Sequence, residues 1–103
     1  MYYNRKGEPI TIEEWLFQRR RYEENVLARE NLANSFIVAT FFTGKDPGYR
    51  EELGGEPLIF ETVIFDCRPS VNNSAKVFGR ELYPNMAEAL LGHQRLVNYY
   101  KDF

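Results

Sequence analysis

The sequence predicts an α+β fold, in which an antiparallel sheet of three to four strands has an N-terminal and a C-terminal helix packed on one face. Residues 36–42 and 58–65 are apolar segments of strand length, rich in Phe, Ile and Val, and these residue types favour strands. Segments that begin at Thr11 and Asn85 each start with a capping residue and continue with a helical apolar pattern. The expected order is therefore helix, strands, helix.

Length and composition describe one compact unit. A chain of 103 residues is large enough for one hydrophobic core and too small for two, so residues 1–103 are expected to form a single domain. Aromatic residues make up 16% of the chain, and surplus aromatic surface often ends in an interface. The net charge of -2 provides no general surface for neutralising phosphates, so we expect no binding of duplex nucleic acid.

The sequence also indicates where the protein resides. Cys67 is the single cysteine, so it has no partner for an internal disulfide. The first residues show no positive segment followed by an apolar core, the pattern of a signal peptide. The longest apolar stretches are far shorter than the roughly 20 residues that a membrane helix needs. We expect a cytoplasmic protein without a membrane segment.

The N-terminal residues 1–10 are expected to form a short strand and a turn, because Gly7 and Pro9 interrupt the chain there. Thr11 and Glu14 match a capping box, in which the Thr hydroxyl accepts from the third helical amide. The apolar residues that follow share one helical stripe: Ile12, Trp15 and Leu16. This pattern predicts an amphipathic helix that packs on the sheet.

The end of this first helix admits two interpretations, because residues 19–24 contain good helix formers and neither Gly nor Pro. In one, the helix continues to about Leu32. In the other, it stops near Tyr22, residues 26–30 form an extra strand, and residues 31–34 turn into the strand at 36–42. We prefer the second interpretation.

Residues 43–57 are expected to form a long loop, because they contain four of the seven glycines and two of the five prolines. Loops of this length are uncommon inside a compact domain and often carry function. A strand over 58–67, a turn over 69–74 and a last strand over 75–81 follow.

The C-terminal helix is expected to begin after Asn85, with Glu88 in the capping-box position. Its apolar residues recur at three- and four-residue intervals: Met86, Ala89, Leu90, His93, Val97 and Tyr100. Gly92 lies in the middle of this helix at a cost of about 1 kcal/mol relative to Ala. We therefore expect another group to approach the backbone closely at Gly92.

Both faces of the two central strands are apolar. In the first strand, Ile37, Ala39 and Phe41 alternate with Phe36, Val38 and Phe42. An antiparallel sheet that is open to water on one side should be polar on that side. The second face is therefore either covered by the 43–57 loop or used for association, and we expect a homo-oligomer, most simply a dimer.

Several short motifs run through nearly the whole chain: residues 2–10 (Tyr-Tyr-Asn-Arg-Lys-Gly-Glu-Pro-Ile), Glu14-Trp15, residues 57–62 (Pro-Leu-Ile-Phe-Glu-Thr), Glu88-Ala89-Leu90 and Gly92-His93. Together they resemble the landmarks of a family of small uncharacterised bacteriophage and prophage proteins. The resemblance implies a viral or prophage setting, inside the host cell, and brings no catalytic residue. At residues 45–48 the chain departs from the family's usual Asp-His pair, which argues against a metal site in the loop.

No nucleophile elbow, phosphate loop or metal-ligand cluster occurs at a diagnostic spacing. His93, the only histidine, lies on an apolar stripe, which indicates a hydrogen-bonded core residue rather than a general acid or base. Glu61 lies in an otherwise apolar strand and needs a partner if it is buried, so we expect a buried polar pair with His93 or with an arginine. The sequence therefore predicts no catalytic residues, no metal and no cofactor.

Two basic segments are candidate binding residues for a ligand or a partner. Arg19, Arg20 and Arg21 form a run that can clamp phosphates or pair with an acidic partner, although flanking glutamates allow local ion pairs. In the 43–57 loop, Lys45, Tyr49 and Arg50 combine charge and stacking with glycines that expose backbone amides.

Three functions are compatible with these patterns. The preferred one is a non-enzymatic phage accessory protein that binds or inhibits a host or viral protein. The alternative is a binding protein for a small ligand such as a nucleotide signal, which would require a cleft where arginines and a Tyr ring converge. The third is a minor component of the virion.

Overall fold

The computed structural model describes residues 1–20, 22–46, 55–69 and 76–103. It confirms the α+β class, with one antiparallel sheet of four strands in the order β3 (Val26–Asn31), β4 (Phe36–Phe42), β5 (Phe60–Asp66) and β6 (Lys76–Tyr83). The long helix α3 (Met86–Tyr100) follows the sheet. Four short elements precede the sheet: β1 (Tyr2–Tyr3), β2 (Pro9–Ile10), α1 (Ile12–Arg19) and α2 (Tyr22–Asn25).

Each strand of the sheet pairs with the next strand in the sequence, so the sheet is an antiparallel meander. The central strands β4 and β5 pair without a register shift, from Phe36 opposite Asp66 to Phe42 opposite Phe60. The two edge strands each contain a register shift, and such bulges increase the local twist of a sheet. The preferred interpretation of the sequence after Tyr22 is confirmed, because the chain enters a strand at Val26.

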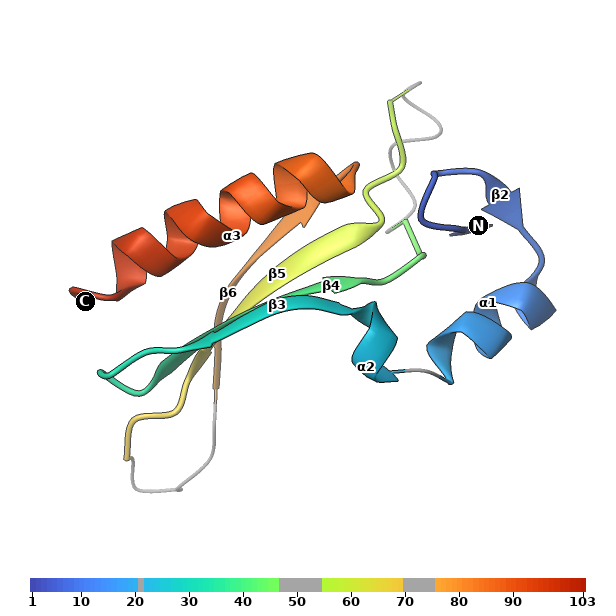
Figure 1. The fold of residues 1–103 in the computed structure, drawn as a ribbon. Coiled ribbons are helices and arrows are strands. Elements are labelled where there is room, and N and C mark those ends of the chain that lie inside the picture. The colour runs from blue at the N-terminus through green and yellow to red at the C-terminus, as the bar shows by residue number, and fades with distance from the viewer. Residues whose placement is uncertain (21, 47–54, 70–75) are drawn as a thin grey trace.

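Helix α3 lies across one face of this sheet (Figure 1). Alternation along the strands directs every second side chain of β4 and β5 toward the helix. The core beneath α3 has two clusters of buried residues: Tyr3, Phe42, Ile59, Phe60 and Ala89 in one, and Phe36, Val38, Ile64 and Leu96 in the other. At the C-terminal end of the helix, the Asn34 side-chain amide donates to the carbonyl oxygen of Tyr100 at 2.7 Å, which ties the helix end to the sheet.

Asn85 caps α3 as expected, with its side chain accepting from the Glu88 amide at 2.9 Å. The buried stripe of the helix differs from the expected one: it comprises Ala89, Gly92, His93 and Leu96, whereas Met86 and Leu90 are exposed. The close approach at Gly92 is confirmed. A Cβ atom at this position would lie 2.1 Å from the Tyr83 hydroxyl oxygen, so only Gly lets β6 and α3 come this close.

Residues 1–20, which we call the N-terminal arm, do not pack as expected. Thr11 caps α1, accepting from the Glu14 amide at 3.2 Å, but no residue of α1 is buried. The helix lies with the β1–β2 pair beyond one end of the sheet, not on a sheet face (Figure 1). The expectation that both helices cover one face is therefore corrected, because α3 covers that face alone.

The arm is attached to the end of the sheet through residues that follow β4. The Tyr3 amide donates to the Gly44 carbonyl at 2.8 Å, and the Trp15 indole donates to the Thr43 carbonyl at 3.0 Å. Gly44 has φ +66°, and a Cβ atom there would lie 2.9 Å from the Tyr3 carbonyl oxygen. Both observations require glycine at this junction.

Candidate functional site

The face of the sheet opposite α3, which we call the open face, is the strongest candidate for a functional surface. No element among the described residues covers it. The register of the strands arranges its side chains in three rows across the sheet. From β3 to β6 the rows are Asn31, Ile37, Phe65 and Val77, then Arg29, Ala39, Val63 and Arg80, then Val26, Phe41, Glu61 and Leu82.

On the two central strands, the middle row of the open face has smaller side chains than the rows beside it. Ala39 and Val63 lie opposite each other in the middle row and are 5% and 6% exposed. The larger Phe41 and Phe65 lie in the rows on either side of them and are half-buried. The structure contains a cavity of about 640 Å³ over Ala39, extending toward β3.

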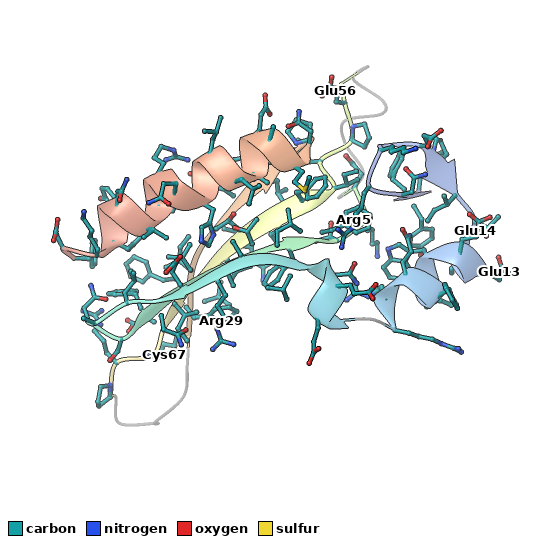
Figure 2. The ribbon with its side chains drawn as sticks, viewed as in Figure 1. Arg5, Glu13, Glu14, Arg29, Glu56 and Cys67 are labelled. Carbon is teal, nitrogen blue, oxygen red and sulfur yellow. The ribbon has the colours of Figure 1, made fainter. Side chains whose placement is uncertain are left out.

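This cavity is lined mainly by apolar side chains and by one residue of each charge: Glu23, Val26, Arg29, Ile37, Ala39, Phe41, Phe65 and Cys67. Figure 2 shows Arg29 and Cys67 on the side of the sheet away from α3. Cys67 is half-buried in the wall of this cavity. The arrangement offers apolar contact over a broad area with few directed polar groups, and provides no reactive pair.

Glu61 and His93 do not form the expected pair, because they lie on opposite faces of the sheet. Glu61 belongs to the open face, where its carboxylate lies 3.6 Å from the Arg80 guanidinium. His93 lies on α3 and faces the covered side. The alternative partner for Glu61, an arginine, is the one that the structure contains.

His93 is a buried core residue, as its place on an apolar helix stripe predicts. Its Nδ1 lies 2.7 Å from the Thr40 hydroxyl, which in turn lies 2.6 Å from the Thr62 hydroxyl. Its Nε2 is buried and forms no hydrogen bond. Burial lowers the pKa of His93, and the nearby charge of Glu30 opposes this change. The imidazole is therefore neutral at physiological pH and is shut off from the open face.

On β6, Glu81 connects the covered side of the sheet to α3. Its carboxylate accepts hydrogen bonds from the Tyr83 hydroxyl and from Arg95. Burial, with a further contribution from Glu81, raises the pKa of Tyr83 to about 12. These groups hold β6 against the helix and lie away from the open face.

The basic residues predicted as binding residues are partly brought together. Arg19 stacks over the Trp15 ring at 4.9 Å, and with Lys45 and Arg80 it lines a cavity of about 370 Å³ at the arm end of the sheet. Arg20 is exposed at the C-terminal end of α1. The remaining predicted residues, Arg21, Tyr49 and Arg50, lie outside the described residues.

Sequence reasoning missed Arg29 and Arg80, the two cations of the middle row. In principle, counting every second residue along each edge strand would show which residues share a face with Ala39 and Val63. The register shifts in β3 and β6 make this counting fail. Asp46 was also missed. It is 5% exposed and accepts from the Leu58 amide at 2.7 Å, which fixes the base of the 43–57 segment.

Among the described residues, no three His, Cys, Asp or Glu side chains come close enough together to hold a metal ion. No helix in this part of the chain is both long enough and apolar enough to cross a membrane. No family model matches the chain, and neither does a curated protein or a solved structure.

Proposed function

We propose that this chain is a non-enzymatic accessory protein that acts by binding another protein chain through the open face of its sheet. The observation that carries this proposal is the apolar character of that face. The half-buried Ile37, Phe41 and Phe65 lie around the buried Ala39 and Val63 on the two central strands. Monomeric proteins rarely leave a large contiguous apolar surface in water, and such surfaces commonly mark interaction sites.

The composition of the open face also supports a protein partner. Interface cores are enriched in aromatic residues and Arg and depleted in Lys, Asp and Glu. The three rows contain two Phe and two Arg, with Glu61 as the single acidic residue. The resemblance to phage and prophage proteins supports a setting inside an infected or prophage-carrying host cell.

The proposal is tested with a photocrosslinker placed on the open face. We would incorporate p-benzoylphenylalanine in place of Phe65, express the chain in its host, irradiate, and analyse crosslinked species by mass spectrometry. The matched control carries the same group in place of Leu91, which is 74% exposed on α3. We expect crosslinks to a protein chain from position 65 and none from position 91. Absence of a protein crosslink at position 65 would contradict the proposal.

A second candidate function has one observation in its favour. Arg19, Lys45 and Arg80 line the same cavity of about 370 Å³, a volume within the range of small-ligand sites. Three cations near one concave surface suit a phosphate or carboxylate group. The same cavity also contains the carboxylates of Asp46 and Glu61, which leave an excess of only one positive charge, so we rank this function below protein binding.

Native mass spectrometry separates the two candidates. The chain would be purified gently from its host, and the Arg19→Glu variant would be prepared in the same way. A retained mass of nucleotide size that disappears in the Arg19→Glu variant would support the ligand function. A spectrum with protein subunits alone would contradict it.

A further inference from the structure

We infer that the protein chain seated on the open face is a second copy of this chain, packed face to face about a twofold axis. The inference rests on the proposed function, since it names the partner of the same surface. A twofold interface brings one surface patch against itself. The open face must therefore be complementary to itself in shape, in charge and in size.

The shape of the open face meets this requirement. Its hollow lies over Ala39 and extends toward β3, and Phe41 and Phe65 line it from the two flanking rows and from different central strands. When two such faces oppose each other, the phenyl rings of each copy can enter the hollow of the other. Side chains from two inner sheet faces interdigitate in this way in β-sandwiches.

The charges on the open face are also self-complementary, and they select an arrangement. Arg29 and Arg80 occupy the two ends of the middle row, and Glu61 lies one row away. If the strands of the two copies were aligned, each arginine would oppose an arginine of the second copy. If the strands cross at about 90°, the other common sheet packing, one arginine of each copy reaches the Phe41 and Glu61 row and the other reaches the Ile37 and Phe65 row.

Both rows, the one with Phe41 and Glu61 and the one with Ile37 and Phe65, can bind a guanidinium group. A carboxylate pairs with it directly, and a phenyl ring attracts a cation placed over its face. Among the described residues, the Arg29 guanidinium donates to the Asn31 side-chain oxygen at 3.2 Å. The Glu61 carboxylate lies 3.6 Å from the Arg80 guanidinium, which is a long distance for an ion pair. The Arg29 guanidinium and the Glu61 carboxylate can therefore each make a further contact.

The size of the face predicts a reversible dimer. Four strands spaced about 4.8 Å apart and seven residues long give a footprint of roughly 19 Å by 23 Å. This footprint is about 440 Å². Stable interfaces bury about 800 Å² on each partner, so the open face supplies an interface below the standard size. We expect dissociation in the micromolar range.

Sedimentation equilibrium of the purified full chain tests the inference at concentrations from about 1 to about 500 μM. The wild-type chain should pass from 12.2 kDa to twice that mass. Phe65→Glu places a carboxylate in the apolar centre of the interface and should weaken the dimer at least about 100-fold. Leu91→Glu, on the exposed side of α3, is the matched control and should dimerise like wild type. Circular dichroism establishes that both variants are folded.

A second readout reports on the open face directly. Cys67 is the single cysteine of the chain and lines the cavity of this face, so its reaction with a thiol reagent measures access to it. Its rate should fall as the wild-type concentration rises, and should stay constant in Phe65→Glu. A rate independent of concentration, in a wild-type chain that dimerises, would place the interface elsewhere and overturn the inference.

The outcomes separate this inference from the proposed function. A wild-type chain that stays monomeric up to 500 μM, while position 65 still crosslinks to a different protein in cells, overturns the second copy and leaves the proposed function standing. A monomer without any crosslink at position 65 overturns both. A dimer that Leu91→Glu breaks and Phe65→Glu does not would assign the interface to α3.

Discussion

At the scale of single residues, the contact between Gly92 and Tyr83 controls how closely α3 approaches β6. Gly92→Ala improves intrinsic helix propensity by about 1 kcal/mol, yet its Cβ would meet the Tyr83 hydroxyl oxygen at 2.1 Å. Overpacking of this kind costs about 1–3 kcal/mol or more. We therefore expect Gly92→Ala to lower the free energy of unfolding by about 2 kcal/mol, measured by urea denaturation.

The matched control for this prediction removes the obstructing ring. In a Tyr83→Ala background, Gly92→Ala should be neutral or stabilising by up to about 1 kcal/mol, because only the helix propensity remains. Equal destabilisation in both backgrounds would show that the ring of Tyr83 is not the reason for glycine at this position.

The buried His93 predicts how stability depends on pH. Because burial lowers its pKa in the folded chain, the unfolded chain takes up a proton first as the pH falls through about 6.5. The unfolded state is then favoured, and the free energy of unfolding should decrease below that pH by at most about 1.4 kcal/mol per pH unit.

Urea denaturation at pH 7.5, 6.5 and 5.5 measures this effect, because His93 is the only histidine in the chain. The His93→Leu variant keeps the hydrogen bond between Thr40 and Thr62 and should lose the dependence on pH over this range. A wild-type slope that persists in the variant would assign the dependence to another group.

Residue-level prediction from the sequence succeeded where the signal is local. The caps at Thr11 and Asn85 and the close approach at Gly92 follow from short patterns whose chemistry is complete within a few residues. The pairing of Glu61 with His93 failed because it depends on which face α3 covers. Both faces of the central strands are apolar, so alternation alone gives no way to choose between them.

At the scale of elements, the N-terminal arm lies at the end of the sheet, where its Tyr3 is buried in the core cluster with Phe42 and Phe60. Trp15 connects it to the sheet through the hydrogen bond to Thr43. Within the arm, Trp15 also contacts the Tyr2 ring at 4.5 Å and lies under Arg19. We expect Trp15→Ala to release the arm, with amide hydrogen exchange over residues 2–19 accelerated at least about tenfold.

The sheet provides the internal reference for this measurement. Amides around Phe36, Val38 and Ile64 should keep their protection in Trp15→Ala, since this cluster packs under α3 and contains no residue of the arm. Phe17→Ala, at a residue 62% exposed on the same helix, should leave exchange in the arm unchanged. Loss of protection in β4 and β5 along with the arm would show that the arm and the sheet unfold as one unit.

The position of α1 could not be predicted from its own amphipathic pattern. That pattern indicates which residues share a stripe, but not which surface is available to cover them. A helix of 15 residues spans about 22 Å, which matches a seven-residue strand at about 23 Å. Helix α3 therefore occupies the length of the covered face, and the bond between Tyr3 and Gly44 holds the arm at the end of the sheet.

At the scale of the whole molecule, the crossed arrangement of two copies makes a specific prediction about charge. In the crossed orientation that brings Arg29 to Glu61 of the second copy, Arg29→Glu and Glu61→Arg should each weaken self-association, because each variant brings like charges together across the twofold axis. Mixed in equal amounts, the two variants should form a heterodimer about tenfold tighter than either homodimer, since opposite charges then meet at both contacts.

The same mixing experiment with Arg80→Glu and Glu61→Arg tests the other crossed orientation. Rescue by one of the two pairs would identify which arginine reaches Glu61 of the second copy. Rescue by neither pair, with the wild-type chain still dimeric, would contradict crossed strands and favour aligned ones. Sedimentation equilibrium measures all of these affinities.

Apolar residues on both sides of the strands at 36–42 and 58–65 predicted a second apolar face, and the register of β4 and β5 contains one. What the sequence could not supply is the row structure of that face, because edge-strand register depends on bulges that form only in the assembled sheet. The sequence also could not predict that the candidate ligand residues lie together. Arg19 and Lys45 are 26 positions apart in the sequence and line one cavity because the arm is attached beside β4.

The location of Trp15 also determines what an optical experiment on this protein reports. It is the only tryptophan, and its surroundings are Tyr2, Arg19 and the Thr43 carbonyl, none of which belongs to the core beneath α3. Intrinsic fluorescence therefore follows detachment of the arm, whereas far-ultraviolet ellipticity follows the sheet and α3. Two different midpoints from these probes would be the signature of an arm that leaves before the rest unfolds, and a single-probe transition would misstate the stability of the domain.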